Sequence, residues 1–249
     1  MRNGQRPAVA LVTGAASGIG AATAETLAES HDVIALLDLE NADFSQVSGR
    51  VAERGAQPQV LTCDVTVEAD VERAVAAAAA HGDLVAAVNN AGVGGPVLPV
   101  GEYSLEDWRK VLDVDLTGVF LCLRAEVRLM TRPGCIVNVS SIYGTAALPL
   151  APAYTTAKHG VEGLTKSAAL AYAAEGLRVN AIAPGYIGTE LFRGRHTPEQ
   201  ADAIGSRHPI GRLGSVEEVA SAIAFLVSPA ASFVTGASYR VDGGYLTQQ

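Results

Sequence analysis

Tyr154 and Lys158 lie one helical turn apart in the segment YTTAK, and Ser141 precedes them. A free phenol is a poor base at neutral pH because it ionises near pH 10. On a helix the two side chains share one face, so the Lys158 ammonium favours the phenolate form of Tyr154. Such a phenol exchanges protons with an alcohol or carbonyl oxygen, to which Ser141 can donate a hydrogen bond. Acid–base catalysis is predicted; the alternative for Ser141 is to satisfy a backbone group.

A glycine-rich segment, TGAASGIG at 13–20, stands where a short apolar run meets an amphipathic stretch. Glycines there let the backbone turn tightly and approach a pyrophosphate, and a helix N-terminus offers free N–H groups. The spacing is not Gly-x-Gly-x-x-Gly, and no Lys-Ser/Thr pair follows as in a P-loop. An ordinary glycine turn is the alternative. The residues predicted to bind the phosphates of a dinucleotide are Gly14, Ser17, Gly18, Ile19 and Gly20.

Asp38 closes the second apolar run, where the adenosine ribose of a bound dinucleotide should lie. Its carboxylate can accept hydrogen bonds from both ribose hydroxyls of NAD, whereas the 2′-phosphate of NADP would meet like charge. At about 4 Å and an effective dielectric near 20, that repulsion is roughly 4 kcal/mol, or close to a thousandfold in affinity. Neither Ser17, Leu39 nor Glu40 supplies a compensating cation. We therefore predict NAD as the cofactor, although a strand-end aspartate also serves as a turn former or helix cap.

Two further segments follow the third and fourth apolar runs, namely Asp64-Val65 and Asn89–Gly92. In open α/β sheets, ligands bind at the carboxyl ends of the strands. Asp64 is therefore expected either to reach the adenine amino group or to cap a helix that starts near Glu68. The second segment is expected either to contact the cofactor or to form a plain turn. Its predicted cofactor contacts are Asn90, Ala91 and Gly92.

Short runs rich in Val, Ile and Leu alternate with longer Ala-rich amphipathic stretches along the chain. This alternation predicts an α/β fold with a single Rossmann-like, doubly wound parallel sheet of about seven strands and helices on both faces. Strands are expected at 8–13, 33–38, 59–63, 84–89, 135–140, 178–183 and 238–241. Helices are expected at 19–30, 44–54, 68–81, 105–131, 153–175 and 216–226. We predict one domain over 1–249, in which 186–214, long for a connection, forms a lid or substrate loop.

Acidic side chains outnumber basic ones, 26 to 18, and the formal charge of the 249-residue chain is −8. A nucleic-acid or anionic-membrane partner would call for a basic face, so we expect neither. Five scattered histidines and three scattered cysteines show no metal-ligand spacing, so we expect no metal site. The odd cysteine count, the short polar start and the lack of a membrane-spanning apolar run favour a cytoplasmic location.

In this order, these segments make the chain resemble the short-chain dehydrogenase/reductase family from Val9 to Gly244. The resemblance implies a nicotinamide-dependent alcohol/carbonyl oxidoreductase, commonly a homotetramer. It implies that Tyr154 is the acid/base, that Ser141 orients the substrate oxygen and that Lys158 holds the nicotinamide ribose. The cofactor contacts that it adds are Tyr154, Lys158, Pro184, Gly185, Ile187 and Thr189.

One position departs from the family's pattern. In DLTG at 115–118 the family has asparagine first and assigns it a water-mediated proton relay to the lysine, whereas this chain has Asp115. If the backbone carbonyl of residue 115 holds the water, the proton relay does not depend on the side chain and is retained. An ionised Asp115 side chain would instead raise the pKa of Lys158 and weaken its effect on Tyr154. We predict that Asp115 belongs to the catalytic group and that activity survives with an altered pH optimum.

The substrate is expected between three loops, 93–103, 142–152 and 186–214. Their side chains suggest a mostly apolar wall, so a neutral, fairly hydrophobic secondary alcohol or ketone is favoured, with a polyol or hydroxy acid left open. The predicted substrate contacts are Tyr143, Leu148, Tyr186 and Leu191. Arg193, Arg195 and His196 either bind a carboxylate or, as the preferred interpretation, are solvated loop charges.

Three other functions compete with this prediction. Reduction of a 3-oxoacyl-carrier-protein would favour NADPH and a basic docking face, and this chain is acidic. A non-catalytic NAD-binding regulatory module would not need Tyr154 and Lys158. An epimerase or dehydratase would need a substrate domain of its own, for which 249 residues leave little room.

Small residues on the 153–175 helix, including Gly160 and Gly163, favour close packing with a partner, so we predict a homotetramer to which this helix and 106–131 contribute.

Overall fold

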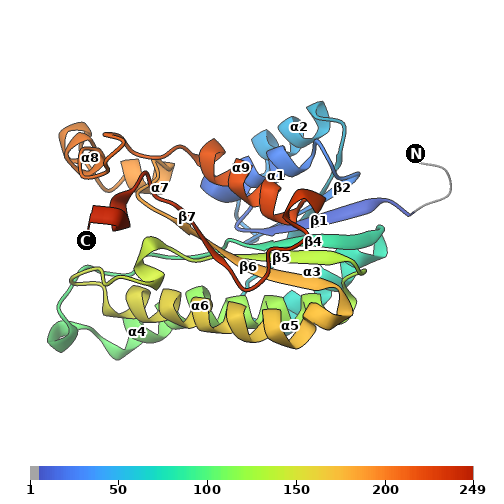
Figure 1. The fold of residues 1–249 in the computed structure, drawn as a ribbon, viewed down its shortest axis with the longest axis horizontal. Helices are drawn as coiled ribbons and strands as arrows, with labels where there is room; N and C mark the ends of the chain where they lie inside the picture. The colour runs from blue at the N-terminus through green and yellow to red at the C-terminus, as the bar shows by residue number, and fades with distance from the viewer. Residues whose placement is uncertain (1–5, 249) are drawn as a thin grey trace.

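Seven parallel strands form one sheet in the order β3-β2-β1-β4-β5-β6-β7, in a computed structural model that describes residues 6–248 (Figure 1). The strands are β1 Ala8–Thr13, β2 Val33–Asp38, β3 Gln57–Thr62, β4 Asp83–Asn89, β5 Gly134–Val139, β6 Leu177–Pro184 and β7 Ser238–Val241. The order reverses between β1 and β4, and such a switch point opens a crevice at the carboxyl ends of the strands.

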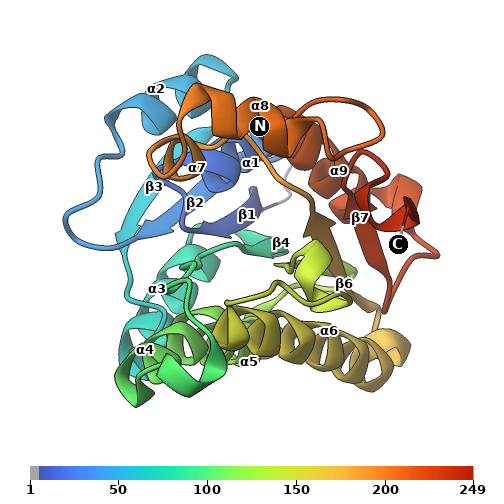
Figure 2. The ribbon, with the colours of Figure 1, turned by 90° about the vertical axis from the view of Figure 1, so that its left-hand side faces the viewer.

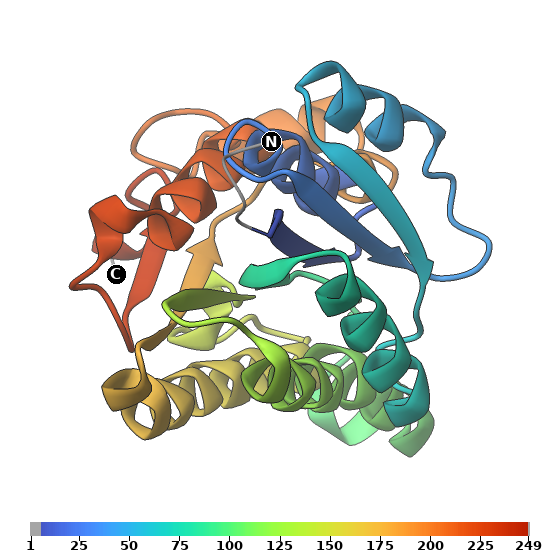
Figure 3. The ribbon, with the colours of Figure 1, turned by 90° about the vertical axis from the view of Figure 1, so that its right-hand side faces the viewer.

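Helices cover both faces of this sheet, as Figures 1 and 3 show. The main helices are α1 Gly18–Leu27, α2 Ser45–Glu53, α3 Glu68–Ala80, α4 Leu105–Leu112, α5 Val119–Leu129, α6 Pro152–Tyr172 and α9 Val216–Val227. One apolar cluster packs α1, α2 and α9 against one face, and a second packs α3, α5 and α6 against the other. The predicted doubly wound α/β fold is confirmed. No helix within 6–248 is both long and apolar enough to cross a membrane.

The predicted helix over 105–131 needs a correction. The helix ends at Leu129, and Asp113–Gly118, between α4 and α5, winds as a π-helix. Such wider turns are rare within α-helices and often occur at functional sites. Here the π-segment contains Asp115, whose side chain is fully buried. Helical hydrophobic periodicity does not report this change, because the π-segment spans only six residues.

The stretch 186–214 also differs from the expected loop, because it contains two short helices, α7 Glu190–Arg193 and α8 Pro198–Gly205. The α8 helix starts with a capping box, in which the Thr197 side chain accepts from the Gln200 backbone and the Gln200 side chain accepts from the Thr197 backbone. Figure 2 looks onto the carboxyl edge of the sheet, where α7 and α8 lie on one side and α4 on the other. The segment is therefore placed to cover the crevice.

A buried polar network joins β4 and β5 to α5 and α6. The Asn89 Nδ2 atom donates to Glu126 Oε2 and to Asn138 Oδ1, both at 3.0 Å, and Asn138 Nδ2 donates to Thr165 Oγ1 at 2.9 Å. Burial raises the pKa of the Glu126 carboxyl from 4.5 to about 7, against the lowering effect of the Asn89 bond. The native protein thus holds this proton more tightly than the unfolded chain does.

Glu126→Gln is expected to gain stability over the wild type as the pH rises. Between pH 4.5 and about 7 the native state binds more protons than the unfolded state, so the free energy of unfolding of the wild type falls by about 3 kcal/mol. The glutamine variant lacks this titration. Urea unfolding at pH 5 and pH 8 measures the difference, with Glu53→Gln, an exposed position, as the control. An equal difference from wild type at both pH values would contradict the buried, protonated carboxyl.

Candidate active site

The glycine loop after β1 is tied to the end of β4. Thr13 Oγ1 accepts from the backbone N–H groups of Asn90 and Ala91, at 2.9 and 3.0 Å. The Asn90 side chain donates to the carbonyl oxygens of Thr13 and Gly14, at 3.0 and 3.1 Å. These bonds hold the loop in place across the switch point. Asn90, a predicted cofactor contact, therefore also braces this loop. The role of Thr13 could not be predicted, because it depends on strands that are neighbours only in the folded sheet.

Two of the loop glycines are required by the turn itself. Gly14 has a φ of +63°, a conformation that favours glycine, and a Cβ on Gly20 would lie 2.0 Å from the Gly14 carbonyl oxygen. Gly20 is buried and does not line the cleft described below. Its part is therefore to let α1 start close to the strand, which brings the backbone N–H groups of Ser17–Ile19 to the cleft.

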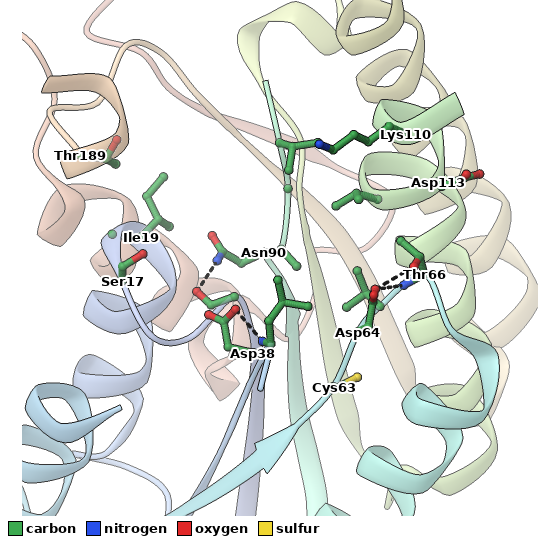
Figure 4. A pocket seen from close by; sticks show the side chains of 18 of the residues that line it. Ser17, Ile19, Asp38, Cys63, Asp64, Thr66, Asn90, Lys110, Asp113 and Thr189 are labelled. Carbon is green, nitrogen blue, oxygen red and sulfur yellow. Dashed lines mark hydrogen bonds between the residues drawn. The ribbon is translucent and has the colours of Figure 1, made fainter. Parts of the chain in front are cut away.

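Asp38 stands at the end of β2 beside this loop (Figure 4). Its Oδ2 atom accepts from the Ala16 N–H at 3.0 Å, and its Oδ1 accepts from the Leu39 N–H at 2.9 Å. The carboxylate thus braces the loop while it lines the cleft. Each oxygen retains a second lone pair, so the side chain can still accept from a ligand hydroxyl.

A cleft of about 890 Å³ lies along the carboxyl ends of β1 to β4, within the size range of ligand sites. The predicted cofactor residues that line it are Gly14, Ser17, Gly18, Ile19, Asp38, Asp64, Val65, Asn90, Ala91, Gly92 and Thr189. Arg109 and Lys110 of α4 also line it. Neither was predicted, because no motif in the sequence around them indicates a ligand site.

Asp64 does not cap α3. Its Oδ1 atom accepts from the backbone and the hydroxyl of Thr66, at 2.9 and 2.7 Å, which closes a tight turn. The residue that precedes α3 is Val67, and it makes no side-chain cap. The capping alternative is thus wrong. Asp64 remains in the lining of the cleft, as its other interpretation requires.

A second cavity, of about 570 Å³, adjoins the cleft and shares with it Ile19, Asn90, Gly92, Val93 and Thr189. The predicted residues that line it are Asp115, Ser141, Tyr143, Leu148, Tyr154, Lys158, Pro184, Gly185, Tyr186 and Ile187. Ser141, Tyr154 and Lys158, which are predicted to transfer the proton, therefore line the same cavity. Leu191 was also predicted here, but its side chain lies outside the described part of the structure.

Lys158 and Asp115 form a buried ion pair beneath this cavity. The Lys158 Nζ atom lies 3.5 Å from Asp115 Oδ2 and donates to the Val139 carbonyl oxygen at 3.1 Å. Asp115 Oδ1 accepts from the Val93 N–H at 2.7 Å. Burial by itself lowers the pKa of Lys158, but the charges of Asp115 and Tyr154 outweigh it and raise the pKa above its usual value. Burial also raises the pKa of Asp115, an effect that Lys158 opposes.

Tyr154 is half-buried, and the Lys158 Nζ atom lies 5.5 Å from the centre of its ring. Ser141 Oγ accepts from the Tyr143 backbone N–H at 3.2 Å, which leaves the Ser141 hydrogen to donate elsewhere. A second phenol in the cavity, Tyr143, shares a 2.8 Å hydrogen bond with the Tyr186 hydroxyl. Burial raises the pKa of Tyr143 well above its usual value, so this hydroxyl does not act as a base.

Basic side chains of the 186–214 segment divide into two groups. Arg195 and His196 line the cavity, together with Arg207, which the sequence analysis did not consider. Arg193 turns away, and its Nε atom donates to the Gly188 carbonyl oxygen at 3.2 Å. Arg193 and Arg195 are exposed, as the preferred interpretation of solvated loop charges expects, and Arg195 and His196 also face the site, as the alternative requires.

Comparison with known proteins supports the resemblance to short-chain dehydrogenases/reductases. A family model described as enoyl-(acyl carrier protein) reductase matches residues 14–246. A cis-4-hydroxycyclohexanecarboxylate dehydrogenase from Sinomonas cyclohexanicum is 48% identical over 95% of this chain and 96% of its own. A cyclohexanol dehydrogenase from Acinetobacter sp. (strain SE19) is 42% identical over 96% and 95%.

Among solved structures, an NAD⁺-bound xylitol dehydrogenase superimposes with a TM-score of 0.89 at 35% identity, over 95% of this chain and 98% of that one. The match extends over the whole sheet and both helical layers. The relatives named above are dehydrogenases of alcohols, which supports the same reaction class for this protein. The chain belongs to the short-chain dehydrogenase/reductase family and is an oxidoreductase.

Proposed function

We propose that this protein is an NAD(H)-dependent oxidoreductase that interconverts a secondary alcohol and a ketone, with Tyr154 as the acid/base. The observation that carries the proposal is the meeting of Ser141, Tyr154 and Lys158 in a cavity that opens into the cleft beneath the glycine loop. A substrate oxygen in the cavity would thus lie beside a ligand in the cleft. Proton transfer and hydride transfer need this proximity.

The donors and acceptors of the cleft fit a dinucleotide. The N-terminus of α1 offers N–H groups to phosphates, and Thr189, which caps α7, lies beside Gly18 on the same side of the cleft. Asp38 supplies a carboxylate where the adenosine ribose would lie, which favours NAD over NADP because a 2′-phosphate would meet like charge. Pro184, Gly185 and Ile187 line the adjoining cavity and would border the nicotinamide.

When bound, the nicotinamide accepts or returns hydride, and the protein supplies geometry and proton transfer. In the oxidative direction the Tyr154 oxygen takes the proton from the substrate hydroxyl. Ser141 donates a hydrogen bond to the same oxygen, because its bond from the Tyr143 N–H leaves the hydroxyl hydrogen free. Lys158, held by the Val139 carbonyl and Asp115, keeps positive charge beside the Tyr154 ring and so favours the phenolate.

Asp115 would moderate this effect, because its carboxylate offsets part of the Lys158 charge. With the carboxylate gone, the phenolate of Tyr154 is stabilised more strongly. We therefore expect Asp115→Asn to remain active and to shift the rising limb of the pH–rate profile for alcohol oxidation to lower pH by about one unit. Profiles of kcat/KM from pH 6 to 10 measure the shift, with Asp202→Asn, exposed on α8, as the control. Superimposable curves would make the Asp115 side chain a bystander.

The walls of the cavity favour a cyclic secondary alcohol. Tyr143, Tyr186 and Phe192 present aromatic rings, which pack edge to face at centroid distances near 6 Å, and Leu148 and Ile187 add aliphatic surface. The two relatives with the cyclohexanol and hydroxycyclohexanecarboxylate names act on alcohols of six-membered rings, which supports the same ring size here.

The proposal is tested by mixing the enzyme and NAD with a panel of secondary alcohols and following NADH absorbance. NADH should appear with cyclic alcohols and should need Tyr154. Tight NAD binding without turnover of any alcohol would favour the regulatory module instead. Turnover confined to NADPH and 3-oxoacyl thioesters would favour the acyl-carrier-protein reductase.

The assembly and placement of the chain are proposed along with this activity. We expect residues 1–249 to act as one domain with 186–214 as its lid, in a cytoplasmic homotetramer. The exposed apolar side chains of Phe120 on α5 and Leu170 on α6, which are 44% and 86% exposed, support a contact between copies there. Gly160, in contrast, already packs against Leu116 of its own chain, where a Cβ would lie 2.8 Å from the Leu116 side chain.

A further inference from the structure

The catalytic cavity carries more positive charge than proton transfer requires. Besides Lys158, it is lined by Arg195, His196 and Arg207. Asp115 is the one acidic side chain among the described lining residues, and it is paired with Lys158. In a chain with a formal charge of −8, acidic partners are plentiful. An excess of arginine at this one place therefore points to a ligand that brings its own negative charge.

Arg207 is an exposed residue whose guanidinium is oriented at the cavity wall by Tyr245. Its Nη2 atom donates to the Tyr245 hydroxyl at 2.6 Å, and its guanidinium carbon lies 5.4 Å from the centre of the Tyr245 ring. Tyr245 is itself buried. A guanidinium has five N–H donors, of which this bond uses one. Within 6–248, no carboxylate lies within 4.0 Å of the Arg207 guanidinium.

Arg195 approaches the same cavity from the lid. Its Nη1 atom lies 2.7 Å from the point where a Cβ would stand on Gly94, so the guanidinium rests on bare backbone in the loop after β4. No ion pair of Arg195 is found in the described part of the chain. The two arginines, from the α7–α8 and α8–α9 connections of the lid, thus line one cavity, and each has guanidinium donors that no carboxylate in the described part of the chain uses.

His196 adds a third donor or acceptor beside them. Its ring stacks on Phe192 at a centroid distance of 4.3 Å, and its Nδ1 atom lies 2.9 Å from the Phe192 carbonyl oxygen. Because a carbonyl oxygen only accepts, Nδ1 carries a hydrogen and Nε2 is left for a ligand. The ring is therefore oriented by the lid itself before any ligand arrives.

We propose that the substrate is a hydroxy acid and that Arg207 and Arg195 bind its carboxylate, a proposal that rests on the function proposed above. The apolar side chains of Leu148, Ile187 and Phe192 line the same cavity. A substrate that reaches from Tyr154 to the arginines would place its hydrocarbon part against this apolar lining. Two guanidinium groups match the planar, two-oxygen geometry of a carboxylate. The substrate class narrows from any secondary alcohol to one with a distant carboxylate.

The test compares 4-hydroxycyclohexanecarboxylate with its neutral amide, 4-hydroxycyclohexanecarboxamide, with the cis and trans isomers assayed separately. We expect the wild-type kcat/KM with NAD to favour the acid about 10- to 100-fold, as charge-assisted hydrogen bonds would give. Arg207→Gln should lower this acid-to-amide ratio about 10-fold or more, and Arg195→Gln should lower it in the same direction. Arg207→Lys, which keeps the charge, should recover part of the ratio. Arg193→Gln is the matched control and should keep the wild-type ratio.

A binding measurement separates this inference from the reaction on which it rests. Calorimetry gives the Kd of cyclohexanecarboxylate, which has no hydroxyl to oxidise, for the enzyme–NAD mixture, and Arg207→Gln should weaken it about 10-fold. Equal turnover of acid and amide, with no arginine-dependent binding, would overturn the inference and leave the proposed function standing. Arginine-dependent binding without turnover of either compound would overturn the function and leave the carboxylate site.

Discussion

Asp38→Asn should raise the ratio of kcat/KM for NADP to that for NAD by about a thousandfold. The carboxylate and a 2′-phosphate at about 4 Å repel by roughly 4 kcal/mol at an effective dielectric near 20, and the amide removes this repulsion. The substitution keeps an oxygen that can accept from the Ala16 or Leu39 N–H, so the glycine loop retains part of its support.

Steady-state kinetics with both cofactors measure the change in the NADP-to-NAD ratio. Glu40→Gln is the control, because Glu40 is a neighbouring exposed carboxylate outside the lining of the cleft. A thousandfold change confined to Asp38→Asn is the predicted result. An unchanged ratio in Asp38→Asn, or the same change in both variants, would show that the Asp38 charge does not select the cofactor.

Tyr154→Phe should reduce kcat about a thousandfold, within the range that general acid–base catalysis contributes. Phenylalanine keeps the ring that lies beside Lys158 and removes the oxygen that exchanges the proton. Tyr143→Phe is the matched control, because that phenol lines the same cavity but is hydrogen-bonded to Tyr186 and held protonated by burial. It should cost far less in kcat. Equal losses in the two variants would mean that Tyr154 acts through packing and not through its hydroxyl.

The sheet could be predicted from the sequence because parallel strands are buried on both faces. Strands such as Val33–Asp38 are therefore continuous apolar runs with clear ends. The ends of elements were predicted less well. For example, the third strand begins at Gln57 and not at Gln59. An exposed edge strand carries polar residues, which blur its hydrophobic pattern.

Site residues that follow a strand or a helical turn were also open to prediction. Asp38, Ser141 and the Tyr154–Lys158 pair lie where local pattern and family resemblance place them, in the lining of two adjoining cavities. The role of Thr13 was not open to prediction, because its partners come from β4, distant in the chain. Arg207 could not be predicted as a site residue for the same reason, because only the folded chain places this loop arginine at the cavity.

The π-helical turn around Asp115 is a further feature that could not be predicted from the sequence. The sequence alone shows that an aspartate stands where the family has asparagine. The π-turn that buries it, and the 3.5 Å approach to Lys158, arise from the packing of the 113–118 segment against α6 and the loop after β4. Spacing along one helix does not encode contacts between two helices.

The central claim is that the Tyr154 hydroxyl exchanges the proton in the step that transfers hydride. Stopped-flow mixing of NAD-saturated enzyme with a saturating cyclic secondary alcohol, in a single turnover, isolates this step from product release. The account predicts that NADH forms at least about 100-fold more slowly in Tyr154→Phe than in the wild type, with a larger isotope effect when the carbinol hydrogen is deuterium. Formation of NADH at the wild-type rate in that variant would contradict it.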